Sequence, residues 1–347
     1  MTREWLALLR WLGPWANERV PAGVERERIR LGNNEGYVFR APRMAPRGVY
    51  VVTPGMHFLG PDDPRLDRFC RVLARAGFVV VAPLLSDFLA LRLAPGTADE
   101  LAIALGHAHD LARDLRVPGP ALFSISFGSM PAIELAAREG DSGRVSRLVL
   151  FGGFCDFEAT VRHAVLGEAR DPLNSPVVFS NLLEHLDLDV DRGAVLAAWR
   201  TMVERTWGKM ELKRDGARDP IAHEIAMARG LGPRERTLFL AGCGLDPSSR
   251  ALLERGLERA RGKLHYADPR PHLARLRVPL TIVHGRDDDV IPFGQAHDLA
   301  RALPPGHPHE VLLTGFYGHT GAALPSPTAL AREVRTLLAI LTTLSSP

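Results

Sequence analysis

Short apolar runs alternate with segments of helical periodicity along most of this chain, and this alternation limits the fold more than any other feature. The helical patterns occupy 64–76, 97–115, 130–140 and 295–303. The apolar runs occupy 48–53, 78–82, 121–124, 147–151, 279–284 and 310–314. Buried parallel strands have this near-continuous apolar character, and their connecting helices cover both faces of the sheet. The sequence therefore predicts an α/β fold with a mostly parallel central sheet flanked by helices.

The ends of the predicted elements carry local signals. Residues 24–31 and 37–40 predict two strands, and the turn-rich residues 32–36 between them indicate a hairpin at the antiparallel edge of the sheet. Thr97 and Glu100 have the spacing of a capping box, so we expect Thr97 to cap the helix that follows. The spacing in the last helix predicts a buried face made of Leu330, Val334, Leu337 and Leu341.

The alternation lapses between residues 157 and 271, where helical patterns alone are present, and this predicts an inserted helical lid. The lid divides the α/β core into residues 24–156 and 272–347, and residues 1–23 form an N-terminal helical extension. We expect the extension to dock on the body rather than on a membrane or a second copy, through Trp5, Leu8, Leu9, Leu12 and Trp15. Two further stripes are expected to be lid core: Leu196, Trp199, Met202, Val203, Trp207 and Met210, and also Leu252, Leu253, Leu257 and Ala260.

Composition excludes several classes of protein. With 46% hydrophobic and 24% charged residues, the 347-residue chain has the make-up of a soluble globular protein. Its net charge is +3, and the basic residues are interleaved with acidic ones, so no nucleic-acid-binding face is expected. The chain has an odd number of cysteines, and they are widely spaced: Cys70, Cys155 and Cys243. They indicate neither a disulfide framework nor a zinc site. We expect neither a signal peptide nor a membrane span, and a cytoplasmic location.

One strand-to-helix junction has the features of a nucleophile site. The apolar run at 121–124 leads into Ser124-Ile-Ser-Phe-Gly128, immediately before a helical pattern. Small residues at Ser124 and Gly128 allow a tight turn that exposes the Ser126 hydroxyl. The same turn leaves the Phe127 N–H near a helix N-terminus, where it can meet a developing oxyanion.

Two later loops supply the other groups that an active serine needs. Residues 284–292 and 315–321 each follow a predicted parallel strand, and ligands of open α/β sheets bind at the carboxyl ends of the strands. A serine becomes a nucleophile when a histidine accepts its proton and a carboxylate orients that histidine. An aspartate of the first loop and His319 of the second supply these two roles, in the order Ser, Asp, His.

This order and these motifs resemble the α/β-hydrolase superfamily, in its serine-triad esterase and thioesterase branch. The resemblance covers about residues 24–156 and 279–347, and it implies the triad Ser126, Asp288 and His319. Asp288 matches the family acid because Gly285 precedes it by three residues and Ile291-Pro292 follows; Asp287 and Asp289 are its alternatives, and Asp156 is a further one. The resemblance also implies oxyanion donors at the Phe127 and Met56 N–H groups, although Pro54-Gly55 replaces the usual His-Gly.

We therefore expect a serine hydrolase that cleaves a small-molecule carboxylic ester or thioester through an acyl-enzyme. An acyltransferase or a carbon-carbon bond hydrolase with the same triad is the alternative, and a non-catalytic hydrolase-like binding protein is an alternative of another class. No cofactor and no metal site are expected, because Met227 stands where a zinc-protease motif beginning at His223-Glu224 needs its second histidine. Lid shape decides the acyl chain and leaving group, and neither these nor the oligomeric state follows from the sequence.

Overall fold

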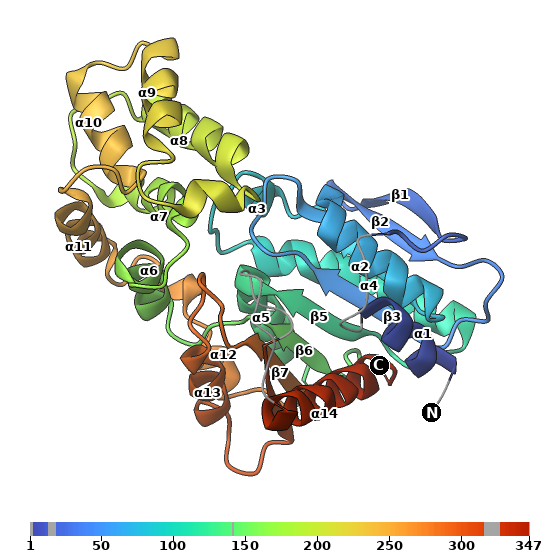
Figure 1. Ribbon diagram of the computed structural model, residues 1–347. Coiled ribbons are helices and arrows are strands. Elements are labelled where there is room, and N and C mark those ends of the chain that lie inside the picture. Colours follow the sequence, from blue (N-terminus) through green and yellow to red (C-terminus); the bar gives the residue numbers. More distant parts are fainter. Residues whose placement is uncertain (1–2, 13–18, 141, 316–326, 347) are drawn as a thin grey trace.

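The computed structural model describes residues 3–12, 19–140, 142–315 and 327–346. Its centre is an eight-stranded sheet with the order β1-β2-β4-β3-β5-β6-β7-β8 (Figure 1). Strands β1 (Glu25–Leu31) and β2 (Asn34–Arg40) form the predicted edge hairpin, and β2 also pairs antiparallel with β4 (Val79–Pro83). The remaining neighbours pair in parallel. The predicted α/β class and mostly parallel sheet are confirmed.

The central strands are apolar because helices cover both faces of the sheet. Every residue of β3 (Val49–Thr53), β4 and β7 (Leu280–Gly285) is buried, as expected for strands in the middle of such a sheet. The other strands are β5 (Ala121–Ile125), β6 (Leu148–Phe151) and β8 (His309–Thr314). Parallel pairing places the carboxyl ends of β3 to β8 along one edge of the sheet, which we call the carboxyl edge.

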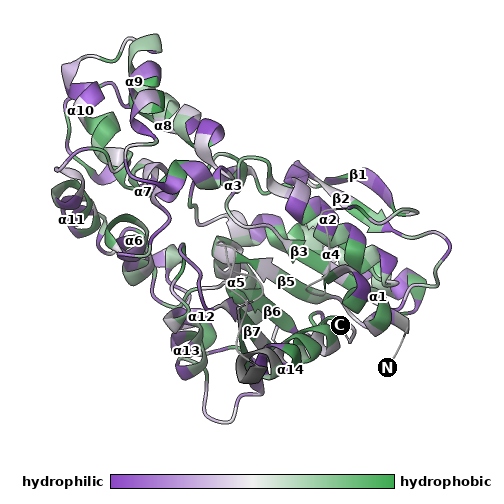
Figure 2. Cartoon of the chain, viewed as in Figure 1, coloured by the Kyte–Doolittle hydropathy of each residue, from purple (hydrophilic) through white to green (hydrophobic). Residues whose placement is uncertain are grey.

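Two groups of helices cover the sheet. Buried side chains of α4 (Thr97–Leu115), α5 (Ser129–Arg138) and α13 (Gly294–Arg301) pack on one face. Those of α1 (Arg3–Leu12), α2 (Pro64–Arg75) and α14 (Pro327–Leu344) pack on the other, and the apolar faces of these helices turn toward the strands (Figure 2). Helix α1 contacts α2 and α14 with Leu8 fully buried, as its stripe predicts, whereas Trp15 lies outside the described residues.

Two local predictions are wrong. Gly96, not Thr97, is the N-cap of α4, and the Thr97 hydroxyl donates a hydrogen bond back to the Ala94 carbonyl. The capping box fails because Glu100 instead accepts the backbone N–H of Ser86. In α14, Val334 is 43% exposed.

The inward position beside Val334 is taken by Glu333, which is buried because it accepts hydrogen bonds from Thr314 and Gly315 at the end of β8. Leu337 and Leu341 are buried as predicted. The side chain of Leu330 lies outside the described residues.

Residues 157–273, all of which are described, contain helices only. The longer ones are α6 (Phe157–Leu166), α7 (Ser175–Leu182), α8 (Arg192–Thr206), α9 (Asp219–Ala228), α10 (Pro233–Gly242) and α11 (Ser249–Ala260), and the short α12 (Arg270–Leu273) closes the segment. We call this part the helical segment; it extends away from the sheet (Figure 1). Its core contains the fully buried Trp199, together with Phe179 and Phe239.

The two predicted apolar stripes of the helical segment have different outcomes. The stripe of α11 is buried throughout, from Leu252 to Ala260. In the other stripe Trp199, Met202 and Val203 are buried, but Leu196 and Met210 are exposed. Met210 departs from the pattern because α8 ends at Thr206 and Met210 begins a separate 3-10 turn, η5 (Met210–Lys213), so the helical spacing no longer applies.

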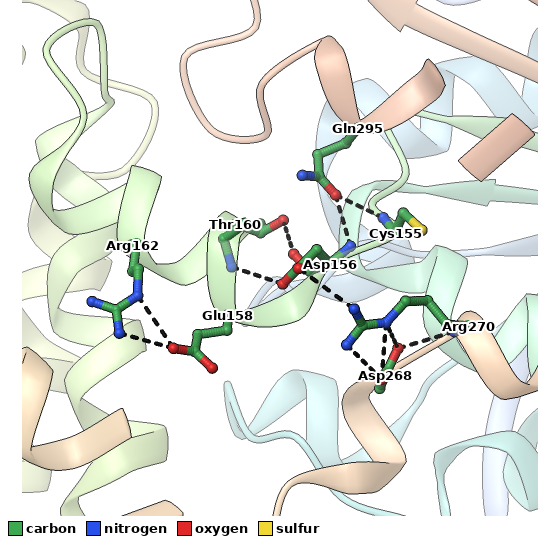
Figure 3. A network of polar contacts seen from close by, with 9 residues as sticks. Cys155, Asp156, Glu158, Thr160, Arg162, Asp268, Arg270 and Gln295 are labelled. Carbon is green, nitrogen blue, oxygen red and sulfur yellow. Dashed lines mark hydrogen bonds and ion pairs between the residues drawn. The ribbon is translucent and has the colours of Figure 1, made fainter. Parts of the chain in front are cut away.

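The chain enters and leaves the helical segment at one place, the neck. The Gln295 side-chain oxygen accepts the backbone N–H groups of Cys155 and Asp156, both at 2.8 Å (Figure 3). The Asp156 carboxylate caps α6 through the Ala159 N–H and lies 3.6 Å from the Arg270 guanidinium, which also binds Asp268. The ion pair of Asp156 with Arg270 thus links the two ends of the helical segment, and Gln295 of α13 (Gly294–Arg301) holds the first end to the α/β core.

Candidate active site

Ser126 is the first residue of the 3-10 turn η2 (Ser126–Gly128), which joins β5 to α5. Its φ is +52°, in the left-handed region that non-glycine residues adopt at a cost of about 1 kcal/mol or more. Gly128 permits the turn, because a Cβ there would lie only 2.4 Å from the Pro54 carbonyl oxygen. The backbone therefore makes the tight, strained turn that the sequence predicts, at the carboxyl edge of the sheet.

The loop after β3 runs directly beside this serine. A Cβ on Gly55 would lie 3.4 Å from the Ser126 Cβ and 3.3 Å from the Ile125 carbonyl oxygen. Met56 is the next residue, so the structure brings both predicted oxyanion positions, Met56 and Phe127, to the surroundings of Ser126. Both side chains are half-buried and pack against the core of the helical segment.

Asp288 lies in the loop after β7, at the same edge. Its Oδ1 accepts the backbone N–H groups of Val290 and Ile291, both at 2.9 Å. Its Oδ2 lies 3.4 Å from His284 Nε2 and 3.4 Å from where a Cβ of Gly152 would stand. Gly152 follows β6, the neighbour of β5, so this carboxylate is held one strand away from the strand that ends at Ser126.

The other candidate acids have different surroundings. Asp289 is nearly buried and forms an ion pair with Lys213 at 2.5 Å. Asp156 is the N-cap of α6 and faces Arg270 at the neck. Asp287 is half-buried in the same loop as Asp288.

His319, the predicted base, lies outside the described residues. The structure describes the approach to its loop: the Thr314 hydroxyl and the Gly315 N–H donate hydrogen bonds to Glu333 Oε2 at 3.0 and 2.8 Å. Strand β8 pairs in parallel with β7, so the loop begins at the carboxyl edge, next to the loop of Asp288.

Two observations together define the fold family. The sheet has the order β1-β2-β4-β3-β5-β6-β7-β8, with β2 antiparallel to both its neighbours. A serine at positive φ makes the turn from the central strand β5 into a helix, and this backbone geometry is that of a nucleophile elbow. The chain has the α/β-hydrolase fold.

Comparison with solved structures found several similar chains. A carboxyl esterase from Bacillus coagulans is 17% identical with a TM-score of 0.48, and the match covers 94% of this chain and 100% of that chain. An esterase from Rhizomucor miehei is 15% identical with a TM-score of 0.46 over 94% and 86%. A 2-hydroxy-6-oxo-6-phenylhexa-2,4-dienoate hydrolase from Rhodococcus is 15% identical with a TM-score of 0.42 over 92% and 98%. No family model and no curated protein matches the sequence.

The α/β-hydrolase sheet also positions a residue that the sequence analysis missed. His284 is fully buried, and its Nε2 lies 2.8 Å from the Ile291 carbonyl oxygen. A carbonyl only accepts, so Nε2 carries the proton, and that proton also faces Asp288. The pairing of His284 with Ile291 follows from the turn of the loop rather than from any sequence motif.

A second histidine, His57, follows Met56; the sequence places it near the oxyanion loop, either touching substrate or bonded to the loop backbone. Its Nδ1 accepts the Leu59 N–H at 3.1 Å, and its Nε2 lies 3.4 Å from Asp63. Burial lowers the pKa of His57, although the nearby Asp63 charge opposes that shift. The ring is therefore held in one tautomer beside the predicted oxyanion loop.

The described residues contain no group of three or more His, Cys, Asp or Glu side chains placed to hold a metal ion. All three cysteines are buried and unpaired. Among the described helices, none has the length and apolar character needed to cross a bilayer.

Proposed function

We propose that the protein is a serine hydrolase that cleaves a carboxylic ester or thioester through an acyl-enzyme. The observation that carries this proposal is the strained turn at Ser126, a non-glycine residue at φ +52° on the carboxyl edge of an α/β-hydrolase sheet. Strain of this kind persists where the surrounding structure enforces it, and it clusters at functional sites. The turn presents a hydroxyl next to a helix N-terminus, as acyl transfer requires.

In the proposed mechanism His319 accepts the Ser126 proton as the hydroxyl attacks the carbonyl carbon of the substrate. The Phe127 and Met56 N–H groups stabilise the oxyanion of the tetrahedral intermediate. His319 then returns the proton to the leaving group, and a water molecule activated by the same base hydrolyses the acyl-enzyme. Asp288 orients His319 and stabilises its cation.

The surroundings of the carboxylates support Asp288 as the acid. Its Oδ1 is held by two backbone N–H groups, which fixes the carboxylate in position. Asp289 is engaged by Lys213, and Asp156 by α6 and Arg270. We further propose that the helical segment acts as a lid over the carboxyl edge, since its core packs against Phe127 and Met56.

Substitution of Ser126 tests the proposal. Ser126→Ala should abolish turnover of short-chain esters and thioesters and also covalent labelling by a fluorophosphonate probe. The matched control is Ser124→Ala, because Ser124 lies two residues away, is fully buried, and loses only a hydroxyl. Wild-type turnover by Ser126→Ala would refute the proposal.

Two further measurements distinguish the alternatives. Asp288→Asn should lower kcat by about 10³-fold or more, whereas Asp156→Asn should not. Mass spectrometry of the products, with and without an alcohol or amine acceptor, separates hydrolysis from acyl transfer. An unlabelled Ser126 in the wild-type protein would favour a binding protein without catalysis.

A further inference from the structure

We propose that Trp207 and Lys213 are positioning residues that clamp together the two loops flanking Ser126. One is the oxyanion loop, residues 54–59, and the other is the acid loop, residues 286–292. The inference rests on the proposed function of Ser126. Residues 207–213 are part of the helical segment. Their first residue, Trp207, contacts the oxyanion loop, and their last residue, Lys213, contacts the acid loop.

Trp207 contacts the oxyanion loop. Its ring centroid lies 5.2 Å from that of His57 and 6.1 Å from that of Phe58, and the rings of His57 and Phe58 stack at 4.6 Å. The Trp207 Nε1–H donates to the Leu173 carbonyl at 2.9 Å, which fixes the orientation of the indole. Aromatic contacts of this geometry add stabilisation beyond the burial of area. The indole therefore holds the residues that directly follow Met56.

Lys213 contacts the acid loop. Its ammonium group lies 2.5 Å from Asp289 and 2.9 Å from Asp171, and all three side chains are nearly buried. The Asp171 N–H also donates to the Asp289 carbonyl at 2.7 Å. Burial acts to lower the pKa of Lys213, but its bonds to the two carboxylates outweigh burial and raise it. The charged lysine therefore holds the residue that directly follows Asp288.

The short segment from Trp207 to Lys213 links the two loops. Strands β3 and β7 are separated by β5 and β6, so three strand spacings of about 4.8 Å place their ends about 14 Å apart. Trp207 contacts the loop after β3 and Lys213 contacts the loop after β7. The segment therefore reaches across the edge at which Ser126 lies.

This arrangement makes the spacing of the oxyanion donors and the acid depend on two side chains outside the α/β core. Displacing a catalytic group by about 1 Å can cost about 10²-fold in rate. Lys213 also places a positive charge beside the acid loop. Asp171, Asp289 and, from α6, His163 are charged or titratable groups that face this region. Burial lowers the pKa of His163, and the charges of Asp288 and Asp289 oppose that shift only in part.

The test compares Trp207→Ala and Lys213→Met with the conservative variants Trp207→Phe and Lys213→Arg. The control Lys263→Met makes the same change at an exposed lysine of the helical segment. Trp207→Ala and Lys213→Met should each lower kcat at least tenfold with KM changed less than about threefold. The conservative variants should recover most of kcat, and the control should match the wild type.

The pH profile distinguishes positioning from general weakening of the structure. Removing the Lys213 charge favours protonation of the catalytic base, so the acid limb of kcat/KM should move to higher pH by more than about 0.3 unit in Lys213→Met. Lys213→Arg and Trp207→Ala should leave the limb in place. If Lys213→Met fails to fold by circular dichroism, Lys213→Gln combined with Asp171→Asn carries the test of kcat and of amide exchange, because it removes one of the two facing carboxylates together with the lysine charge.

Amide hydrogen exchange tests the clamp without any activity. Trp207→Ala should increase exchange in residues 56–59, and Lys213→Met in residues 288–291. Unchanged exchange in both loops, unchanged kcat, or a loss confined to KM overturns the clamp. If the wild-type protein hydrolyses no ester and Ser126 is not labelled, the proposed function fails, while the exchange data still decide whether the contacts hold the loops.

Discussion

Replacing Gly128 by alanine is the sharpest test of the geometry at Ser126. The φ of Gly128 is −60°, so alanine meets no backbone strain there; the position is the N-cap of α5, where alanine brings no gain in helix propensity. A Cβ at this position would nevertheless lie 2.4 Å from the Pro54 carbonyl oxygen, where about 3.0 Å is the closest contact that proteins show. Either the elbow or the oxyanion loop must therefore move by about 0.6 Å.

The atoms that the Cβ would meet belong to the backbone, and the Thr53 carbonyl oxygen would also lie only 3.2 Å from it. Rotation of a side chain therefore cannot relieve the clash. Overpacking of this kind costs about 1–3 kcal/mol. We therefore expect Gly128→Ala to lower the free energy of unfolding by about 1–3 kcal/mol. We expect the displaced loop to slow fluorophosphonate labelling of Ser126 at least tenfold.

Gly106→Ala is the matched control. Gly106 lies inside α4, and a Cβ there would make only an ordinary contact of 3.6 Å with the Arg144 side chain. This variant should be more stable than the wild type by about 0.5–1 kcal/mol and should label normally. Urea unfolding and labelling rates measure both effects. If Gly128→Ala matches Gly106→Ala in stability and labels at the wild-type rate, the close approach of elbow and oxyanion loop is refuted.

Three further predictions concern the frame around the site. Glu333→Gln weakens the anchor of Thr314 and should lower the free energy of unfolding by about 1–2 kcal/mol, with slower labelling of Ser126; an unchanged urea midpoint would contradict this role. Tyr50→Phe removes a buried 3.0 Å hydrogen bond to the Leu344 carbonyl and should lower the free energy of unfolding by about 1–2 kcal/mol. Calorimetry measures this effect, and an unchanged Tm would contradict it. Burial lowers the pKa of His57 in the folded protein, so as the pH falls the unfolded chain binds a proton at this residue before the folded chain does. The free energy of unfolding should therefore fall as the pH drops below about 6.5. His57→Gln should reduce this pH dependence of urea unfolding, and equal slopes in both proteins would disprove it.

The parts of the fold that could be predicted depend on local patterns. The central strands are buried on both faces, so their residues are apolar without interruption and identify them. The turn at Ser126 could also be predicted, because the small residues that it needs lie two positions away in the sequence. The helix does begin at Thr97, but its capping box was misassigned because the partner of Glu100 is Ser86, on another element.

The parts that could not be predicted depend on contacts between distant residues. Nothing in the sequence near Trp207 indicates His57, and nothing near Lys213 indicates Asp289, since each pair forms only when the helical segment meets the sheet edge. Val334 was expected to be buried because it is apolar, but the hydrogen bonds of Glu333 to the end of β8 decide which side of α14 faces inward. Asp288 was predictable as a loop carboxylate, while its contact with His284 was not.

The neck at Asp156 and Arg270 bears on how the helical segment can be replaced without changing the sheet. Since the chain departs from the sheet and returns to it at neighbouring points, everything between them is topologically an appendage. Exchange of that module for another, or its excision with a short linker, leaves the strand order intact. A grafted module must cover the core side chains of Met130, Phe154 and Ile291, and it must also bring its own aromatic and its own cation to the two loops.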